Sequence, residues 1–324
     1  MARHQELSKV SNTELTLTKL SLGTAPLGGL FGSVSEDQAD SMIDYAIGTG
    51  INYIDTAPLY GYGTAERRVG RAVSGRRSGL TISTKVGRPL RPGVNLEMDK
   101  YPDSDPGIET YYDYTPSGIR RGLEASLERL QLESIEIAYI HDAEDRVKEA
   151  IDIVYPVLDE MRREGTLKAI GIGMNWCPAS IEIIKNTELN IALIAGRFTL
   201  LDQSAQEQLY PLALAKGVSI VAAGVYNSGV LANPVEGALF DYLPAPREVI
   251  EKAQKIQEFL KDFDVPLTAA AMQFPLRHPV VATVLTGAGT LEELKANVAA
   301  FDLDLPLNLW SELENAGLIQ PVNT

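Results

Sequence analysis

The sequence predicts an α/β fold in which eight strand–helix units close into a (β/α)8 barrel. Eight short apolar runs rich in β-branched residues alternate along the 324-residue chain with longer segments of helical period. The runs are apolar throughout, which indicates parallel strands covered on both faces by helices. No linker or change of composition divides the chain, so residues 1–324 are expected to form a single domain. The predicted strands are Leu20–Gly23, Ile51–Asp55, Leu80–Lys85, Ile135–His141, Lys168–Gly173, Ile191–Gly196, Val218–Ala222 and Val280–Thr286.

The segments between these runs are typical of amphipathic helices with recognisable ends. Ser35 stands at an N-cap with Gln38 in the capping-box position. Gly50, Gly165 and Gly217 follow helical segments, where a left-handed residue ends a helix well. The predicted helices are Ser35–Gly48, Thr115–Leu130, Arg146–Glu164, Pro178–Thr187, Gln203–Lys216, Pro246–Phe263, Leu267–Arg277 and Thr290–Ala300.

A doubly wound parallel sheet is the alternative fold. Its phosphate-binding fingerprint G-x-G-x-x-G should follow the first strand, but the segment from Gly23 to Gly28 places Pro26 where a helix should begin. The barrel is therefore preferred. The polar, β-branched segment Leu7–Leu20 is expected to form a hairpin that precedes the barrel and closes its bottom.

Two connections are too long to be plain turns: Gly87–Tyr114 after the third strand and Ala223–Ala245 after the seventh. Both leave the carboxyl ends of strands, where barrel enzymes build their sites, and long loops in compact domains are usually functional. Aromatic and polar side chains in them are expected either to line a pocket or to pack the loops. These are Arg88, Arg91, Tyr101, Tyr111, Tyr112, Tyr114, Tyr226, Asn227, Ser228, Phe240 and Tyr242.

The composition excludes several classes of function. A net charge of −14 disfavours binding to nucleic acid or to anionic membranes. One cysteine and three scattered histidines exclude an intrachain disulfide and make a metal site improbable. The N-terminus lacks the apolar core of a signal peptide, and no apolar run is long enough to span a membrane. The chain is therefore expected to be a cytoplasmic protein that is a monomer or a weak homo-oligomer and acts on a small molecule.

Four ionisable residues end three consecutive predicted strands or follow them closely: Asp55, Tyr60, Lys85 and His141. In a barrel these strand ends are neighbours, so the side chains can converge. A lysine ammonium beside a phenol stabilises the phenolate and lowers its pKa, and Asp55 would hold that lysine. His141 could orient a substrate oxygen. Such a set exchanges a proton with a carbonyl or alcohol but offers no evident nucleophile, so a hydride carrier is expected to complete the reaction.

The stretch GINYIDTAPLYGYGTAERRVGRAV at 50–73 resembles the G-x-x-x-x-D-T-A-x-x-Y-G…E-x-x-x-G signature of the aldo-keto reductases. The resemblance covers essentially the whole chain. It implies a nicotinamide-dependent (β/α)8 barrel with Asp55, Tyr60, Lys85 and His141 as its catalytic residues. GIGMN at 171–175 and YNSGVLA at 226–232 are similar to the branch that contains L-fucose, D-threo-aldose and galactose dehydrogenases and pyridoxal 4-dehydrogenase.

The same resemblance implies the cofactor contacts. Members that use NADPH usually place Lys or Arg at positions that fall here on Gly287, Gly289 and Glu293, and Glu293 would repel a 2′-phosphate. NAD is therefore expected, with NADP as the alternative if Arg247, Arg277 or Lys295 supplies the missing charge. Ala195 and Ala223 stand where the family has a glutamine and a stacking tyrosine. The expected cofactor-binding residues are Gly23, Thr24, Asp55, Asn175, Tyr226, Ser228, Gly229, Gly287, Glu293 and Asn297.

Three functions remain in competition on these residues. The first is a nicotinamide-dependent oxidoreductase that oxidises a cyclic hemiacetal to its lactone. An aldose such as L-fucose or D-galactose is preferred over pyridoxal as its substrate, and general NADPH-dependent reduction of aldehydes and ketones is the alternative reaction. The second is a non-catalytic relative that binds or regulates a partner. The third is a Schiff-base aldolase or isomerase, which Asp55 disfavours because it would keep Lys85 charged. A sugar would need polar partners such as Arg88, Asp103 or Asp113, whereas pyridoxal would stack on Phe31, Tyr101, Tyr111 or Tyr112.

Overall fold

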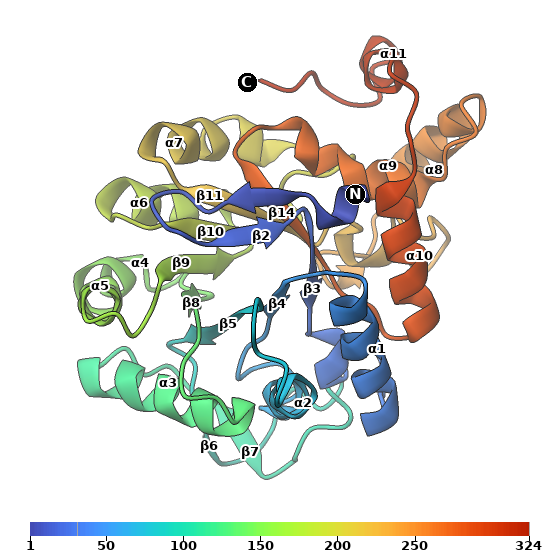
Figure 1. Ribbon diagram of the computed structural model, residues 1–324. Helices are drawn as coiled ribbons and strands as arrows, with labels where there is room; N and C mark the ends of the chain where they lie inside the picture. The colour runs from blue at the N-terminus through green and yellow to red at the C-terminus, as the bar shows by residue number, and fades with distance from the viewer. Residues whose placement is uncertain (31, 324) are drawn as a thin grey trace.

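A computed structural model describes residues 1–30 and 32–323, and Phe31 lies outside them. Its centre is a closed barrel of eight parallel strands, in which the last strand pairs with the first through Val284 and Leu20 (Figure 1). Each strand lies within a predicted run or extends it by one residue, so the predicted fold is confirmed. The strands are β3 (Leu20–Gly23), β4 (Tyr53–Asp55), β5 (Thr81–Val86), β8 (Ile137–His141), β9 (Ala169–Met174), β10 (Ile191–Ala195), β11 (Ser219–Ala223) and β14 (Val281–Thr286).

Helices surround the barrel and bury its outer face (Figure 1). Ser35 accepts a hydrogen bond from the amide of Gln38, and the predicted capping box is present. The segment predicted as one helix over 146–164 contains a wider turn, Ala150–Val154, between α4 and α5. The helices are α1 (Glu36–Gly48), α2 (Thr64–Val73), α3 (Pro116–Leu130), α4 (Val147–Glu149), α5 (Tyr155–Arg163), α6 (Cys177–Asn186), α7 (Leu209–Lys216), α8 (Arg247–Lys261), α9 (Leu267–Gln273), α10 (Leu291–Asp302) and α11 (Leu309–Asn315).

Helices α2 and α11 were not among the predicted helices. In α2, glutamate and arginines crowd the sequence and dilute its apolar pattern, yet Ala65, Val69, Ala72 and Val73 form a buried stripe. Glu66 on the same helix is fully buried, because it accepts hydrogen bonds from Thr84 and Arg129. Paired charges can thus occupy a buried face that a hydrophobicity pattern marks as exposed.

The N-terminal hairpin, β1 (Leu7–Lys9) and β2 (Thr16–Thr18), is antiparallel and lies across the barrel in Figure 1. Val10, Leu15 and Leu17 join the cluster of buried side chains inside the barrel, next to Tyr53 and Ile137. The hairpin therefore closes the end at which the strands begin, as predicted.

Both long loops leave the opposite end, where the strands finish. The loop after β5 contains a small hairpin of β6 (Leu90–Pro92) and β7 (Ile108–Thr110). The loop after β11 contains the short turn Asn227–Gly229 and a hairpin of β12 (Leu239–Phe240) and β13 (Leu243–Pro244). Asp241 and Tyr242 form the two-residue turn of this second hairpin, and both have positive φ angles. The loops can therefore bring side chains over the mouth of the barrel.

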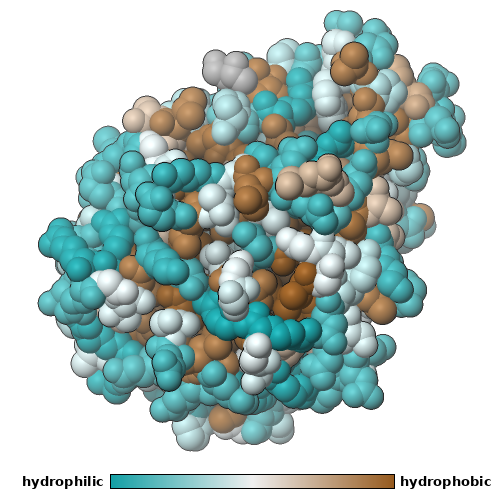
Figure 2. Space-filling model, in the orientation of Figure 1, coloured by the Kyte–Doolittle hydropathy of each residue, from teal (hydrophilic) through white to brown (hydrophobic). Residues whose placement is uncertain are grey.

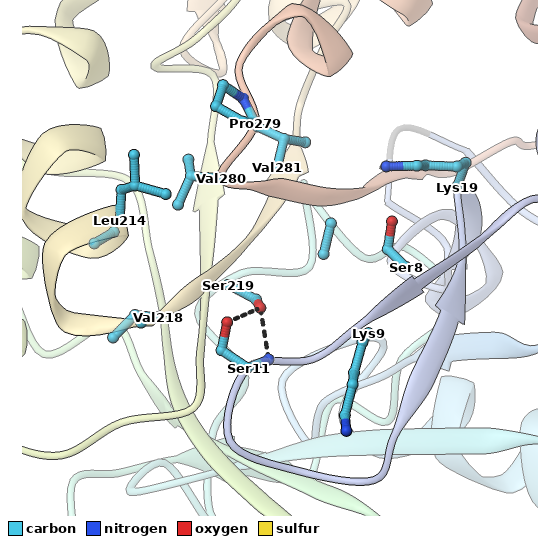
Figure 3. A pocket seen from close by; sticks show the side chains of 13 residues that line it. Ser8, Lys9, Ser11, Lys19, Leu214, Val218, Ser219, Pro279, Val280 and Val281 are labelled. Carbon is cyan, nitrogen blue, oxygen red and sulfur yellow. Dashed lines mark hydrogen bonds between the residues drawn. The ribbon is translucent and has the colours of Figure 1, made fainter. Parts of the chain in front are cut away.

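The face seen in Figure 2 carries hydrophilic residues over most of its rim and apolar residues toward its middle. A cavity of about 210 Å³ lies where the strands begin, between the hairpin, α7 and the starts of β11 and β14 (Figure 3). Ser219 and Ser11 hydrogen-bond one another in its wall. This cavity is at the end of the barrel that the hairpin closes, away from the predicted catalytic residues. Among the described residues no helix is long and apolar enough to cross a membrane.

Candidate active site

A buried ion pair joins the ends of β4 and β5. The Lys85 ammonium lies 2.6 Å from one oxygen of Asp55 and donates a second hydrogen bond, 2.9 Å long, to the carbonyl of Thr56. The other Asp55 oxygen accepts a hydrogen bond of 2.6 Å from the Ser83 hydroxyl. Both members of the pair are almost fully buried, at 2% and 1% exposure. Both carboxylate oxygens are thus occupied, as a buried charge requires.

Tyr60 and His141 complete the predicted constellation. Tyr60 lies on the short loop after β4, and the Lys85 ammonium is 4.6 Å from the centre of its ring. The ring of His141, at the end of β8, meets the Tyr60 ring edge-on with 6.1 Å between the ring centres. The structure therefore brings all four predicted side chains together at the mouth of the barrel.

The pKa of Tyr60 differs from the expectation. Burial raises the pKa of the phenol well above 10, and the Asp55 carboxylate raises it further, while Arg88 opposes the change. The expected lowering of this pKa by Lys85 is therefore wrong. Because Asp55 binds the Lys85 ammonium directly, the pair presents little net positive charge to the phenol. These surroundings favour the neutral phenol of Tyr60, which can donate a proton.

His141 is held neutral. Burial lowers its pKa from 6.5 to about 3; the Asp142 carboxylate opposes that shift, and Lys85 and Arg88 add to it. Its Nδ1 atom is buried without a hydrogen-bond partner among the described residues. A neutral imidazole has one N–H to donate, so His141 can orient and polarise a substrate oxygen beside Tyr60.

An ion pair that the sequence analysis did not anticipate lies beside His141. Asp142 follows it directly with a φ of 44°, a conformation that is unusual for a residue other than glycine. Its carboxylate is 2.6 Å from the Arg88 guanidinium and 3.7 Å from His141 Nε2. The position of Asp142 immediately after a strand-ending histidine was the signal that could have revealed it. A carboxylate and a guanidinium therefore flank the reacting groups.

Aromatic side chains from the two long loops approach the same place. Tyr101 is buried and meets Tyr62 edge-on. The charge of an ionised Tyr242 would raise the pKa of Tyr60 and of Tyr101, so the three phenols form one group. The guanidinium groups of Arg88 and Arg146 lie 5.5 Å and 4.6 Å from the ring centre of Tyr112. The prediction that loop aromatics reach the site thus fits Tyr101, Tyr112 and Tyr242.

Other candidates in the first loop have structural partners instead. Asp103 accepts hydrogen bonds from Ser33 and from the amide of Val34. Asp113 accepts bonds from Thr115 at the start of α3. Tyr111 packs under the Arg91 guanidinium, 4.4 Å from its ring centre. Of the polar side chains proposed for a sugar, Arg88 alone is placed beside the catalytic residues.

The predicted cofactor residues at the ends of β3 and β14 lie against one another. Thr24 is buried and donates a hydrogen bond to the carbonyl of Asp55, which ties the end of β3 to β4. A Cβ atom on Gly287 would lie 2.8 Å from Pro26 and 3.2 Å from the Gly23 carbonyl. Only glycine leaves the backbones this close, so the packing of the end of β14 against the end of β3 depends on Gly287.

Tyr226 and Asn297 link the last two cofactor segments. The Tyr226 hydroxyl donates a 3.0 Å hydrogen bond to the Asn297 side-chain oxygen, whose amide donates to Thr286. Ser228 accepts a hydrogen bond from the amide of Tyr242, and Gly229 has a φ of 114°. The loop after β11 is thereby fixed against α10 and against its own hairpin.

Asn175 lies at the end of β9, and its backbone is held on both sides. Its amide donates to Glu144, and its carbonyl accepts a bond of 2.7 Å from Arg197. Its side-chain amide makes no hydrogen bond to the rest of the described chain. Ala195 and Ala223 are cross-strand partners in β10 and β11, so the two small side chains adjoin. Together these residues place two small side chains and an unpaired amide near the carboxyl ends of β9, β10 and β11.

Charge near the start of α10 is acidic. Glu293 folds back so that its carboxylate accepts a 2.8 Å hydrogen bond from the amide of Gly289. The three cations considered as replacements have other contacts: Arg247 pairs with Glu251, Arg277 pairs with Glu314, and Lys295 lies 5.9 Å from the ring centre of Tyr45. In the described residues, none of these three cations forms an ion pair with Glu293. In residues 1–30 and 32–323, no group of three or more His, Cys, Asp or Glu side chains could hold a metal ion.

The residues at the mouth fit a dinucleotide better than a metal. Closely packed glycine backbones, the free amide of Asn175 and the unpartnered Nδ1 of His141 all face or border one end of the barrel. The fold and these groups define a barrel enzyme of the oxidoreductase class.

Comparison with known proteins specifies the class further. Residues 19–317 match the model of the aldo/keto reductase family, and the chain belongs to that family. It is 36% identical to a pyridoxal 4-dehydrogenase from Microbacterium luteolum, over 97% of this chain and 98% of the relative. It is also 36% identical to a D-threo-aldose 1-dehydrogenase from a Pseudomonas species, over 94% and 95% of the two chains.

Solved structures agree with this assignment. The holo form of an aldo-keto reductase from Bacillus halodurans superposes with a TM-score of 0.80, at 26% identity, over 98% of this chain and 97% of the other. The apo form of the same protein gives a TM-score of 0.71. The chain is thus an oxidoreductase that uses a nicotinamide cofactor.

Proposed function

We propose that the protein oxidises the cyclic hemiacetal of an aldose to its lactone, with NAD as cofactor and Tyr60 as the general base. The observation that carries this proposal is the Lys85 ammonium held between Asp55 and the ring of Tyr60, opposite the neutral imidazole of His141. These groups can receive a proton and position an oxygen, which is what removal of a hydride from a CH–OH carbon requires.

Each side chain has a separate part in the proposed reaction. When bound, an oxidised nicotinamide supplies the hydride acceptor and a positive charge beside the phenol. That charge favours the phenolate of Tyr60, which accepts the hydroxyl proton of the hemiacetal. His141 donates a hydrogen bond to the same oxygen and holds it as it becomes a carbonyl. Asn175 would bind the carboxamide of the nicotinamide, and Ala195 and Ala223 would pack beside its ring.

The proposed preference for NAD rests on the charge near α10. Because the Glu293 carboxylate already occupies the Gly289 amide, a 2′-phosphate would meet like charge and lose a donor. A 2′-hydroxyl can instead donate to a carboxylate.

The proposed substrate class rests on Arg88 and Asp142. This ion pair places a guanidinium and a carboxylate beside His141, and both can bind the hydroxyl groups of a sugar. The D-threo-aldose 1-dehydrogenase among the relatives supports the same class.

Pyridoxal is the second candidate, and Tyr112 favours it. This half-exposed ring lies at the mouth of the barrel near Arg88 and could stack on a flat pyridine through its exposed surface. The relative named pyridoxal 4-dehydrogenase is as similar to this chain as the aldose enzyme.

The test is a panel of L-fucose, D-galactose, D-arabinose and pyridoxal, each incubated with NAD and with NADP. NADH formation together with a lactone product from a sugar is the expected result. Efficient NADPH-dependent reduction of a linear aldehyde, with no oxidation of any sugar or of pyridoxal, would overturn the proposal.

A further inference from the structure

Three buried hydroxyl groups lie beneath the ion pair of Asp55 and Lys85. Side chains two residues apart on a strand point to the same face. Tyr53, Ser83 and Tyr139 each precede Asp55, Lys85 or His141 by two residues and therefore lie one layer deeper inside the barrel. All three are completely buried.

The hydroxyl groups form a continuous chain that ends on the Asp55 carboxylate. Tyr139 and Tyr53 are joined by a hydrogen bond of 2.9 Å, Tyr53 and Ser83 by one of 3.0 Å, and Ser83 and Asp55 by one of 2.6 Å. Each distance is within the range of a good O–H···O bond, and the last is as short as charge-assisted bonds are.

The direction of donation follows from the number of protons. An ionised carboxylate only accepts, so the single hydroxyl proton of Ser83 is donated to Asp55. Ser83 must then accept a hydrogen bond from Tyr53. Because the Tyr53 hydroxyl proton is used in that bond, Tyr53 must in turn accept a hydrogen bond from Tyr139. Burial raises the pKa of both tyrosines well above 10, so both remain donors. Three donors thus point in sequence toward one carboxylate.

Two glycines on the neighbouring strand make room for this arrangement. A Cβ atom on Gly171 would lie 2.8 Å from the Tyr139 ring, and one on Gly173 would lie 3.2 Å from Cε of Lys85. Aliphatic side chains such as Ile137, Ile191 and Leu193 pack the same interior. A polar chain in such a core is costly unless every member is satisfied.

We propose that Tyr53, Ser83 and Tyr139 are positioning residues whose aligned hydroxyl groups fix the Asp55 carboxylate and, through Lys85, set how readily Tyr60 accepts the substrate proton. The inference rests on the proposed role of Tyr60. Hydrogen bonds in a chain polarise one another, so each donor strengthens the next bond toward Asp55. Loss of a donor leaves more negative charge on Asp55, which disfavours the phenolate of Tyr60.

The test is a graded series of variants: Ser83→Ala, Tyr53→Phe and Tyr139→Phe. With the substrate that the panel identifies, Ser83→Ala should lower kcat about tenfold, since it removes the charge-assisted hydrogen bond to Asp55. Tyr53→Phe should lower kcat about two- to threefold, and Tyr139→Phe less, with KM nearly unchanged. The profile of kcat against pH should shift to higher pH in the same order, by about one pH unit for Ser83→Ala and by about 0.3 for Tyr139→Phe.

The pH profile reports on Tyr60, so every group that faces it must be considered. These groups are Asp55 and Lys85 beneath it, His141 and Asp142 on the next strand end, and Arg88, Tyr101 and Tyr242 from the loops. None of them is changed in the series. Tyr210→Phe is the matched control, because its buried hydroxyl has no hydrogen-bond partner within residues 1–30 and 32–323 and its ring packs on Phe198, outside the chain of hydroxyls. This variant should keep the wild-type profile.

A second measurement does not depend on turnover. In protein labelled with ¹³C at tyrosine Cζ, the Tyr53 and Tyr139 hydroxyl protons should exchange slowly in mixed H₂O and D₂O and give split signals. Ser83→Ala and Tyr53→Phe should each shift the Tyr139 signal. If wild-type enzyme oxidises none of the panel, the proposed function fails while this measurement still tests the chain. Unsplit tyrosine signals, or equal pH profiles across the kinetic series, would overturn the inference.

Discussion

The Glu293 carboxylate accepts a hydrogen bond of 2.8 Å from the Gly289 amide, so an acidic side chain occupies the loop that begins α10. We therefore expect kcat/KM to be higher with NAD than with NADP. Glu293→Arg should raise kcat/KM with NADP by about tenfold or more, because it exchanges repulsion for an ion pair. Steady-state kinetics with both cofactors measures the change.

Glu292→Arg is the control for this substitution, since it makes the same change of charge one residue earlier on the exposed surface. It should alter the cofactor ratio by less than Glu293→Arg does. A wild-type preference for NADP of about tenfold, or 1.4 kcal/mol, would refute the assignment of NAD.

Tyr60→Phe should abolish most turnover and leave cofactor binding nearly unchanged. The phenol supplies the proton path, and its loss should cost about 10²–10⁴ in kcat. Titration of NADH fluorescence measures binding in the same variant. Near-normal kcat would remove Tyr60 from the mechanism.

Lys85→Met should slow oxidation and shift its pH optimum upward, because the negative charge of Asp55 is then no longer offset and disfavours the phenolate of Tyr60. It should also lower the free energy of unfolding by about 3–5 kcal/mol, since the Asp55 carboxylate would be buried without its ion-pair partner. Adding Asp55→Asn should restore much of the stability, measured by urea denaturation, but not the activity. Recovery of both stability and activity in the double variant would show that the Asp55–Lys85 ion pair has only a structural role.

His141 should make the protein less stable as the pH falls below 6.5. Its pKa is about 3 in the folded chain and near 6.5 in the unfolded chain, so the unfolded state binds more protons between these values. Stability is thus complete above pH 6.5 and declines by at most about 1.4 kcal/mol per pH unit on acidification toward pH 3. His141→Gln should flatten this dependence in urea denaturation, whereas an unchanged slope would contradict the buried neutral imidazole.

Arg88→Met should separate the two candidate substrates. It removes the guanidinium beside His141, so kcat/KM for an aldose should fall about 10- to 100-fold, as expected for lost charge-assisted hydrogen bonds. Turnover of pyridoxal should fall less, because stacking on Tyr112 remains. Tyr112→Leu is the converse variant. Equal losses on both substrates would argue against a sugar-binding role for Arg88.

The barrel could be predicted from sequence because its strands are buried on both faces and therefore read as continuous apolar runs. Helix α2 was missed because buried Glu66 and Arg68 are stabilised by partners distant in sequence, such as Thr84 and Glu36, which a local pattern cannot show. Such pairing overrides the hydrophobic period of a short helix.

The convergence of Asp55, Tyr60, Lys85 and His141 could also be predicted, since adjacent strands end at one rim. The raised pKa of Tyr60 could not, because it depends on how completely the loops bury the phenol. Asp142 was overlooked because its left-handed backbone turns it back toward Arg88. Loop conformation, unlike strand order, is not encoded in a simple period.

The pairing of β14 with β3, by which Val284 meets Leu20, has a consequence for synthesis of the chain. The first strand leaves the ribosome more than 250 residues before its second neighbour exists. Until then one edge of β3 has unpaired backbone groups, and the nascent sheet can bind other chains through it. Because this contact joins strands more than 250 residues apart, the barrel should close late and slowly during folding.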